Sequence, residues 1–487
     1  MTAVWVIGVP LLSSPLVYLA GRLRNAGRSC ALIALLAAWA PFVVAARALG
    51  PEGAVTITVG TMALVIDGVS VLVAAIALTL GLMVVLFSGP DIAGEAGEEK
   101  YYAMLVAMIG AIIGLGAAAD LFNLWVWFEA MAVASYMLVA FHREQPAALE
   151  ADVKYLVQSA AGSVLVLIGI AGVLAQTGTL SLQEIGRAPA TPLVQAAAAL
   201  FIVGFGVKAA VVPLHTWLPD AHAQAPSGIS AMLSGIVIGA ALVALLRVLV
   251  ALGPAGASWG AVLMGIAAFN LLAGNLLALR QTQVKRLLAY SSVSQMGYVV
   301  LGLGVAVYAG APAAASGALF HLTTHALMKG LAFLATGALI YSARPGAALT
   351  VADLNGAARR YPLAGFALSV AMLGLAGLPP LAGFMSKWQI FAGVAATREP
   401  AAIALVVFAA ANSVLSLAYY APLVNAVYRC EASDVMRDGR AMPAAMTAAL
   451  VALGVGVIAL GVWPGLVRWL TDPAGSAILR ALGGGTP

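Results

Sequence analysis

Apolar segments of about 20 residues recur along the whole chain, and this repetition constrains the fold more than any other feature. A hydrocarbon core roughly 30 Å thick needs about 20 residues of α-helix to cross it. Of the 487 residues, 63% are hydrophobic and only 9% are charged, whereas soluble domains carry charge on about a quarter of their residues. The composition therefore excludes a soluble fold and predicts an all-α polytopic membrane protein surrounded by lipid.

The apolar pattern predicts about fourteen transmembrane helices with no separate soluble domain. The predicted spans are 3–20, 29–49, 68–88, 102–119, 120–141, 154–176, a broken 194–224, 227–250, 255–278, 283–306, 312–341, a broken 363–396, 401–428 and 443–470. The first segment has no basic residues before it and no clear cleavage site. We therefore interpret it as a retained helix and not as a signal peptide.

Basic residues outside the spans are distributed unequally between the two sides. Most of them follow odd-numbered spans, among them Arg22, Arg24, Arg143, Lys285 and Arg286. Because lysine and arginine accumulate in cytoplasmic loops, this bias predicts a prokaryotic-type cytoplasmic membrane with both termini on the outer, periplasmic side. The same bias accounts for the net charge of +5, so we expect no nucleic-acid partner.

The chain contains two cysteines, Cys30 and Cys430. Two cysteines are too few to hold an iron–sulfur cluster, and no Gly-x-Gly-x-x-Gly in a strand–helix context indicates a nucleotide site. We therefore expect no redox cofactor and no redox chemistry in this chain.

Charged side chains lie inside the predicted spans, at Glu129, Lys208, Lys329 and Lys387. A lysine at the centre of the bilayer costs about 2.5–3.5 kcal/mol on insertion scales, so it needs a partner or a wet cavity. The opposite signs suggest that Glu129 pairs with Lys208, and a carboxylate that moves relative to a buried lysine can load or release a proton. Any one of these residues, Lys387 above all, could simply tie helices together; the set favours a proton or cation pathway.

His321, His325 and Lys329 recur at i, i+4 and i+8, which places them on one face of a helix. A neutral imidazole accepts a proton on one nitrogen and donates from the other, so this stripe suits proton relay. No helical carboxylate or cysteine accompanies the two histidines as a third ligand, so we predict no metal site.

Helix-breaking prolines interrupt two of the spans, and they are Pro213, Pro219 and Pro226 in the first and Pro379 and Pro380 in the second. Freed backbone groups are tolerated at membrane depth only beside protein or water. A buried lysine lies near each break, and matching interruptions in two halves indicate a repeated architecture around a pathway. For either break alone, an ordinary proline kink is the alternative.

His215 and His222 lie within the first break. They either extend the relay toward the cytoplasm or form structural hydrogen bonds that hold the irregular backbone, and the sequence leaves both open. Ser291, Ser292 and Gln295 line a further apolar span, where they carry water or serve as helix-packing contacts.

Four long stretches resemble one family. FGVKAAVVPLHTWLPDAHAQAPSGISAMLSG, QVKRLLAYSSVSQMGY, FHLTTHALMKGLAFL and GLPPLAGFMSKW are similar to the antiporter-like subunits of respiratory complex I, of related membrane-bound hydrogenases and of Mrp-type cation/proton antiporters. The resemblance runs from about residue 100 to 425. It implies two inverted five-helix repeats, each with one broken helix, and the organisation 1–100 for helices 1–3, 101–250 for helices 4–8, 251–428 for helices 9–13 and 429–487 for a loop and helix 14.

The resemblance also implies roles for the buried charges. In the family a glutamate on helix 5 pairs with a lysine on helix 7, and a polar axis leads to a charged residue on helix 12; Glu129, Lys208 and Lys387 occupy those positions. Many members carry a further lysine on helix 8, and the aligned position here is Gly239. Either water, serines and histidines bridge this gap or conduction is impaired.

These observations predict a proton-translocating subunit of a complex I-like pump, driven by an NADH or other donor:quinone oxidoreductase or by a hydrogenase-type complex. Other membrane subunits would handle the electrons, while this chain moves protons or Na⁺. One alternative is an Mrp-type Na⁺/H⁺ antiporter subunit, and a second is a structural membrane-arm subunit with an impaired path. A third is a solute symporter, which would need a roomy polar pocket.

Overall fold

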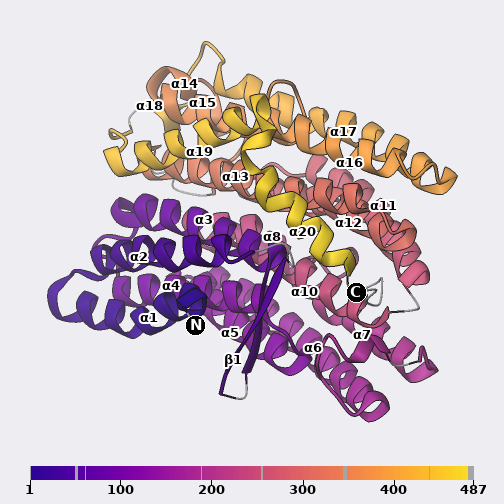
Figure 1. Ribbon diagram of the computed structural model, residues 1–487. Coiled ribbons are helices and arrows are strands. Elements are labelled where there is room, and N and C mark those ends of the chain that lie inside the picture. The colour runs from indigo at the N-terminus through magenta and orange to yellow at the C-terminus, as the bar shows by residue number, and fades with distance from the viewer. Residues whose placement is uncertain are drawn as a thin grey trace.

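The computed structural model describes residues 2–49, 53–60, 62–187, 189–253, 256–343, 348–437 and 439–480, and these form one bundle of helices (Figure 1). Within those residues, twelve helices are long and apolar enough to cross a membrane. Two shorter apolar helices, α7 (Pro192–Lys208) and α15 (Pro362–Ala376), are each followed by a second short helix, so that they form two broken spans. Twelve continuous and two broken spans confirm the predicted polytopic helical fold.

The first half of the chain contains η1 (Thr2–Val4), α1 (Trp5–Arg24), α2 (Gly27–Arg47), α3 (Gly68–Ile92), α4 (Glu98–Ala117), α5 (Leu121–Val139), η2 (Ala140–His142), α6 (Pro146–Thr177), η3 (Ile185–Arg187), α7, α8 (Trp217–Gln224), α9 (Ser227–Met232), the π-helical η4 (Leu233–Val237) and α10 (Ile238–Ala251). The second half contains α11 (Gly256–Leu279), α12 (Val284–Ala309), α13 (Pro312–Ala343), η6 (Ala352–Leu354), α14 (Ala357–Arg360), α15, α16 (Ala382–Ala395), α17 (Pro400–Val427), α18 (Asp434–Arg437), α19 (Ala444–Val462), η7 (Pro464–Val467) and α20 (Arg468–Arg480).

A β-hairpin that the sequence analysis did not predict precedes α3. β1 (Ala54–Val59) and β2 (Met62–Asp67) pair antiparallel, with Ala54 opposite Asp67. Asp67 ends the hairpin and caps the N-terminus of α3, where its carboxylate accepts a hydrogen bond from the Ser70 backbone N–H at 2.8 Å. Its Oδ1 atom also lies 2.7 Å from an Arg247 nitrogen, an ion pair that connects the start of α3 to α10.

The predicted last span, 443–470, is too long. α19 ends at Val462, immediately before Trp463 and Pro464, because the residue before a proline is disfavoured in the helical conformation. The chain then continues through η7 into α20, which packs against α13 and α3.

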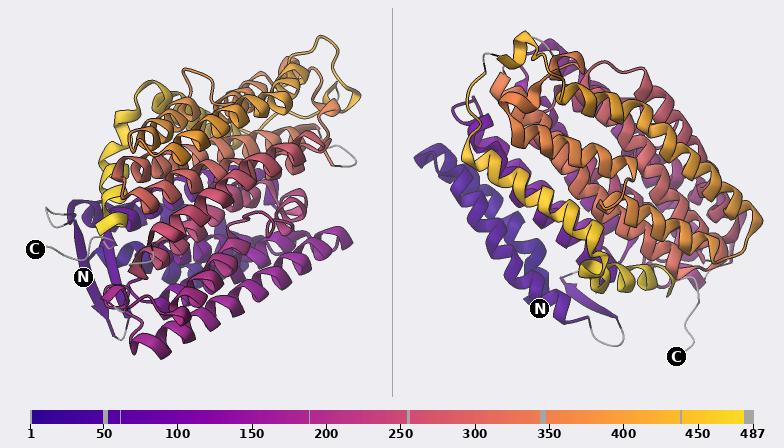
Figure 2. Two further views of the ribbon diagram at one scale, coloured as in Figure 1. Left: turned by 90° about the vertical axis from the view of Figure 1, so that its right-hand side faces the viewer. Right: turned by 90° about the horizontal axis from the view of Figure 1, so that it is seen from above.

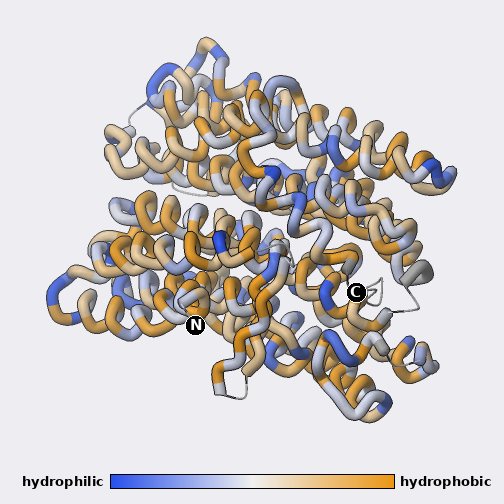
Figure 3. The backbone as a smooth tube through the Cα atoms, viewed as in Figure 1, coloured by the Kyte–Doolittle hydropathy of each residue, from blue (hydrophilic) through white to orange (hydrophobic). Residues whose placement is uncertain are grey.

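The central helix of the bundle is α13. It contacts α12, α15, α16, α19, α20, α3 and α9, and most of its residues are buried. By contrast, α1 and α2 lie at one edge of the bundle and α17 lies at the opposite edge (Figures 1 and 2). Large apolar side chains on these outer helices are exposed, such as Leu12, Leu23 and Val407, as expected of surfaces that face lipid. Figure 3 shows that most strongly hydrophilic stretches lie near the ends of the helices.

The two breaks place the helix-breaking prolines differently. Pro213 lies in the non-helical segment between α7 and α8, and Pro379 and Pro380 lie between α15 and α16. Pro219 instead lies in the first turn of α8, where a missing backbone N–H leaves no hydrogen bond unmade. Pro226 follows α8 and caps α9.

Candidate proton pathway

Lys208 is the last residue of α7, and its side chain is fully buried. The ammonium donates a hydrogen bond to the Ser135 hydroxyl at 3.2 Å. It also lies 4.6 Å from the ring centroid of Tyr136 and 4.2 Å from that of Tyr155. A desolvated cation gains about 2 kcal/mol or more over an aromatic face. The two rings and the hydroxyl therefore form a cage that favours the charged lysine.

Glu129 forms no direct ion pair with Lys208. Among the described residues, no carboxylate oxygen lies within 4.0 Å of the Lys208 ammonium. The Oε1 atom of Glu129 is buried without a hydrogen-bond partner. Glu129 still lies near enough to interact electrostatically with Lys208, and so does Asp152 of α6. The suggested pairing is thus a through-space interaction, because the aromatic cage holds the ammonium.

The sequence analysis missed Ser135, Tyr136, Asp152 and Tyr155. Tyrosine and serine are common in membrane helices, and Asp152 lies outside the predicted span 154–176, so none of them contrasts with an apolar surrounding. The detectable signal is spacing: Asp152 and Tyr155 are three residues apart on one helix and therefore share a face.

Trp217 fixes the position of α8 beneath the cage. Its indole N–H donates to the Val207 carbonyl at 2.7 Å, and its ring stacks on Tyr155 with centroids 4.0 Å apart. The Val207 carbonyl belongs to the last turn of α7, which lacks intrahelical partners. Trp217 therefore holds together the two parts of the first broken helix.

His215 and His222 occupy different surroundings. His215 lies between α7 and α8, edge-on to Tyr290 at 6.1 Å, and its Nδ1 atom has no partner. His222 is fully buried and stacks on Phe333 of α13 at 4.6 Å. Among the described residues, neither ring nitrogen of His222 has a hydrogen-bond partner, so the His222 ring does not hold the break together through hydrogen bonds.

Asp220 of α8 joins three helices. It lies 3.1 Å from the Lys154 nitrogen of α6 and 2.5 Å from an Arg286 nitrogen of α12. Each of these partly exposed pairs contributes little stability by itself, but together they connect α8 to α6 and to α12.

Lys329 of α13 is fully buried and faces α12. Its ammonium donates to the Leu288 carbonyl at 2.7 Å and to the Ser291 hydroxyl. The neighbouring Ser292 hydroxyl also contacts the Leu288 carbonyl, at 2.9 Å. Lys329 is therefore solvated by backbone and hydroxyl oxygens and not by a carboxylate.

His325 contacts the π-helical turn η4. Its Nε2 atom lies 3.2 Å from the Ser234 carbonyl, and its Nδ1 atom has no partner. In this turn the Ile238 N–H bonds to the Leu233 carbonyl, five residues back, instead of to the Ser234 carbonyl, four residues back. The Ser234 hydroxyl in turn lies 2.6 Å from the Ser292 hydroxyl. A hydrogen-bonded link therefore runs from α13 through η4 to α12.

Gly239 lies directly against α13. A Cβ atom at this position would be 2.4 Å from Cδ1 of Leu322, a neighbour of His321. The space beside Gly239 is thus filled by the Leu322 side chain, and the nearby polar contact is the one between His325 and Ser234.

His321 connects α13 to α16. Its Nδ1 atom lies 2.8 Å from the Ser386 hydroxyl, and its Nε2 atom is buried without a partner. The ring centroids of His321 and His325 are 6.2 Å apart, and those of His321 and Tyr298 are 5.7 Å apart. His321 therefore connects the histidine stripe on α13 to Ser386, the residue that precedes Lys387 on α16.

Lys387 lies over the end of α15. Its ammonium donates to the Leu375 carbonyl at 2.8 Å and to the Ser413 hydroxyl at 2.9 Å, and it lies 4.4 Å from the Tyr298 ring centroid. Gly377 ends α15 with φ of +88°, which suits glycine and leaves the last carbonyls open to the lysine. Both broken helices therefore place a buried ammonium at the negative end of their first part.

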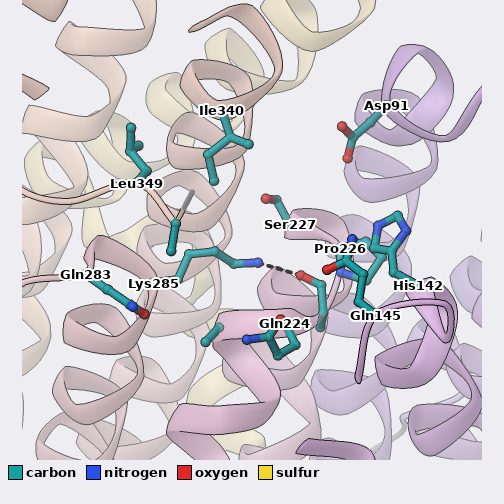
Figure 4. A pocket seen from close by; sticks show the side chains of 13 residues that line it. Asp91, His142, Gln145, Gln224, Pro226, Ser227, Gln283, Lys285, Ile340 and Leu349 are labelled. Carbon is teal, nitrogen blue, oxygen red and sulfur yellow. Dashed lines mark hydrogen bonds between the residues drawn. The ribbon is translucent and has the colours of Figure 1, made fainter. Parts of the chain in front are cut away.

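A cavity of about 450 Å³ opens beside the first break (Figure 4). Polar side chains from four regions point into it: Asp91 of α3, His142 of η2, Gln224 of α8 and Lys285 of α12. Lys285 donates to the Ala225 carbonyl at 2.5 Å. The lining residues come from the helix ends that share one side of the bundle, and none of Lys208, Lys329 and Lys387 is among them.

A bundle with two broken helices, each with a buried ammonium at the end of its first part, defines an antiporter-like multi-pass membrane subunit. The family model described as NADH:quinone oxidoreductase/Mrp antiporter, transmembrane, matches residues 118–416. The chain belongs to this family, as its motifs predicted.

Relatives over most of the chain carry related names. NADH-quinone oxidoreductase subunit N of Desulforudis audaxviator is 32% identical over 79% of this chain and 78% of its own length. F(420)H(2) dehydrogenase subunit N of Methanosarcina mazei is 34% identical over 75% of each.

Solved structures agree with the fold. A chain of an archaeal membrane-bound sulfane sulfur reductase is 27% identical, with a TM-score of 0.88 over 99% of both chains. A chain of Thermus thermophilus respiratory complex I is 30% identical, with a TM-score of 0.79 over 95% of this chain and 98% of that one. A chain of a Dietzia Mrp complex shares the fold, with a TM-score of 0.88 over 99% of both at 24% identity.

Proposed function

We propose that this chain is the proton-translocating membrane subunit of a redox-driven complex of the complex I type. The observation that carries the proposal is the arrangement of three buried ammonium groups: Lys208 and Lys387 at the two broken helices and Lys329 on the helix between them. Burying several titratable groups in a membrane is costly and marks an ion path. The relatives named as oxidoreductase or dehydrogenase subunits N support the redox assignment.

The proposed route begins at Lys208, whose charge Glu129 modulates through space. It continues along His325 and His321 on α13, with Lys329 beside them, and ends at Lys387, which controls release. Contacts of His325 with Ser234 and of His321 with Ser386 supply hydrogen-bonded steps. The unpartnered nitrogen on each histidine leaves a site at which a proton or a water molecule can be accepted.

His222 extends this route toward the side on which the cavity opens. It is fully buried, and both of its ring nitrogens are unpartnered. His215 lies seven residues earlier, before the start of α8. The neighbouring residues Ala223 and Gln224 line the cavity. This placement favours a relay role for His222. His215 is also buried with an unpartnered Nδ1 atom, but neither of its neighbours in the chain lines the cavity.

The proposal includes an organisation and an orientation for the chain. We propose that residues 101–250 and 251–428 are the two inverted repeats, because a five-helix unit reverses the direction in which the next unit begins and the broken span is fourth in each. Residues 1–100 and 429–487 flank them. Both termini then lie on the periplasmic side, and the cavity opens to the cytoplasm. The position of basic residues supports this direction.

The chemistry of electron transfer belongs to partner subunits in this proposal. The chain has only two cysteines, Cys30 in α2 and Cys430 just after α17. Two cysteines are too few to hold an iron–sulfur cluster. The chain therefore holds no redox cofactor itself, and it takes part in catalysis as the ion-moving part of a larger enzyme.

Purification of the complex from its native membrane tests the assignment. Mass spectrometry is expected to identify quinone-reductase or hydrogenase-type subunits, and oxidation of the donor is expected to acidify the vesicle lumen. An assembly with a set of small cation-antiporter subunits, together with Na⁺-driven proton exchange and no electron transfer, would instead identify an Mrp-type exchanger. That rival has support in the shared Mrp fold.

A further inference from the structure

The Lys208 cage lies between two carboxylates on neighbouring helices. α5 and α6 pack against each other, joined by a short connection after His142, and Tyr136 and Tyr155 meet with ring centroids 4.8 Å apart. The two helices run in opposite directions, so the distance of any residue from the α5–α6 connection can be judged relative to the contact between Tyr136 and Tyr155. The contact is the level at which the two rings hold the Lys208 ammonium.

Glu129 lies on the far side of that level from the connection. It precedes Tyr136 by seven residues on α5, two helical turns and roughly 10 Å along the axis, so the two side chains share a face. Its Oε1 atom is buried and has no partner.

Asp152 lies on the near side. It precedes Tyr155 by three residues on α6, about 4.5 Å along the axis, and again shares its face. Its Oδ1 atom is buried without a partner, although the side chain is partly exposed. Asp152 interacts electrostatically with Lys208, Tyr136 and Tyr155. A carboxylate with one inward, unpaired oxygen and one accessible edge can exchange protons with both water and the cage.

We propose that Asp152 is a second proton-exchange residue for Lys208, acting from the side opposite to Glu129. This inference rests on the proposed function. Protonated Asp152 transfers its proton to the neutral Lys208 amine, which leaves an Asp152 carboxylate and a Lys208 ammonium. The O–H bond breaks as the N–H bond forms, and no electrons are gained or lost. Asp152 is then reprotonated by a hydronium ion from the aqueous phase near the α5–α6 connection, which leaves water.

The surroundings of Asp152 contain few competing charges. The titratable groups that interact with it are Lys208 of α7, Tyr136 of α5 and Tyr155 of its own helix. Lys154 of α6 is paired at 3.1 Å with Asp220 of α8, the helix that packs against α6. The charge of Asp152 therefore acts mainly on the Lys208 cage.

The test uses the whole complex reconstituted in liposomes, with proton translocation and electron transfer measured together over a range of pH. Asp152→Asn removes the exchangeable proton at nearly constant volume, and Asp152→Glu restores a carboxyl group. Glu150→Gln is the matched control, because it removes an exposed carboxylate of the same helix that contacts only Lys154. Lys208→Ala is measured in parallel.

Asp152→Asn is expected to lower proton translocation per electron by about tenfold or somewhat more. This loss is smaller than the hundredfold or more that is typical of a positioned acid–base group, because water still reaches the cage. It is expected to flatten the pH profile, with recovery in Asp152→Glu and no change in Glu150→Gln. A wild-type profile in Asp152→Asn, or failure of Asp152→Glu to rescue an assembled complex, overturns the proposal. If Lys208→Ala is also without effect, the proposed function fails as well; if Lys208→Ala alone abolishes translocation, only the role of Asp152 fails.

Discussion

The Nε2 atom of His325 lies 3.2 Å from the backbone carbonyl of Ser234, which belongs to the π-helical turn η4. A carbonyl oxygen accepts a hydrogen bond and cannot donate one, so Nε2 carries the hydrogen. In the neutral imidazole, Nδ1 is then the accepting nitrogen. The π-turn thus orients the imidazole for relay through Nδ1. This contact lies close in the chain to Gly239, the position at which the family resemblance leads us to expect a lysine.

His325→Gln tests this orientation. A glutamine amide can keep the hydrogen bond to the Ser234 carbonyl but cannot exchange protons at neutral pH. We expect an assembled complex whose proton translocation falls at least about a hundredfold, the lower end of the range for loss of a positioned acid–base group. Native gel electrophoresis checks assembly, and dye quenching in vesicles measures translocation. A glutamine variant that pumps at the wild-type rate would remove His325 from the route.

Tyr298 is expected to stabilise the charged form of Lys387. Its ring faces the ammonium at 4.4 Å, while its hydroxyl donates to the Ala409 carbonyl at 3.1 Å. Tyr298→Phe keeps the ring, and Tyr298→Leu removes a contact worth about 2 kcal/mol when desolvated. Proton release should therefore shift in its pH dependence in the leucine variant and remain near wild type in the phenylalanine variant. Equal behaviour of the two variants would assign any defect to the hydroxyl instead.

Introducing the missing lysine should not accelerate the subunit. A side chain at position 239 meets Leu322, so we combine Gly239→Lys with Leu322→Ala to provide space. If His325 and Ser234 already bridge the gap, proton translocation stays at or below the wild-type value. A severalfold increase in the same liposome assay would show instead that the native path is impaired at Gly239. Leu322→Ala alone is the control for the lost packing.

The ion pair between Arg247 and Asp67 is expected to stabilise the fold. The two atoms are 2.7 Å apart, both side chains are largely buried, and Arg247 also donates to the Gly116 carbonyl at 2.8 Å. Arg247→Ala leaves a buried carboxylate unpaired and should lower the free energy of unfolding by about 3–5 kcal/mol. The exposed pair of Arg437 with Asp434 is the control, since its loss should cost less than about 1 kcal/mol. Thermal denaturation in detergent compares the two; similar shifts would contradict the structural role.

The sequence predicted the spans and the buried charges because both depend on contrast with an apolar background. Lys208, Lys329 and Lys387 stand out in that way, and the prolines at 213, 379 and 380 locate the two breaks. The cage around Lys208 could not be predicted, because the contacts of Tyr136 and Tyr155 depend on how α5, α6 and α7 rotate against one another. The missing ion pair of Glu129 has the same origin.

Two further differences follow from local chemistry. The hairpin from Ala54 to Asp67 has one recognisable strand, because VTITV alternates apolar and polar residues between two glycines. Its second strand, MALVID, is almost continuously apolar and is hard to distinguish from the start of the span that follows. The π-turn at Leu233–Val237 contains no proline and no distinctive residue spacing, and its register is visible only in the backbone hydrogen bonds.

The central claim is that protons pass through Lys208, and one measurement tests it most directly. The complex carrying Lys208→Ala, purified with its partners and reconstituted in liposomes, is assayed for proton translocation and for electron transfer in the same preparation. The account predicts an assembled complex in which proton translocation through this subunit is abolished and the ratio of protons to electrons falls. An unchanged ratio of protons to electrons in that variant would contradict it.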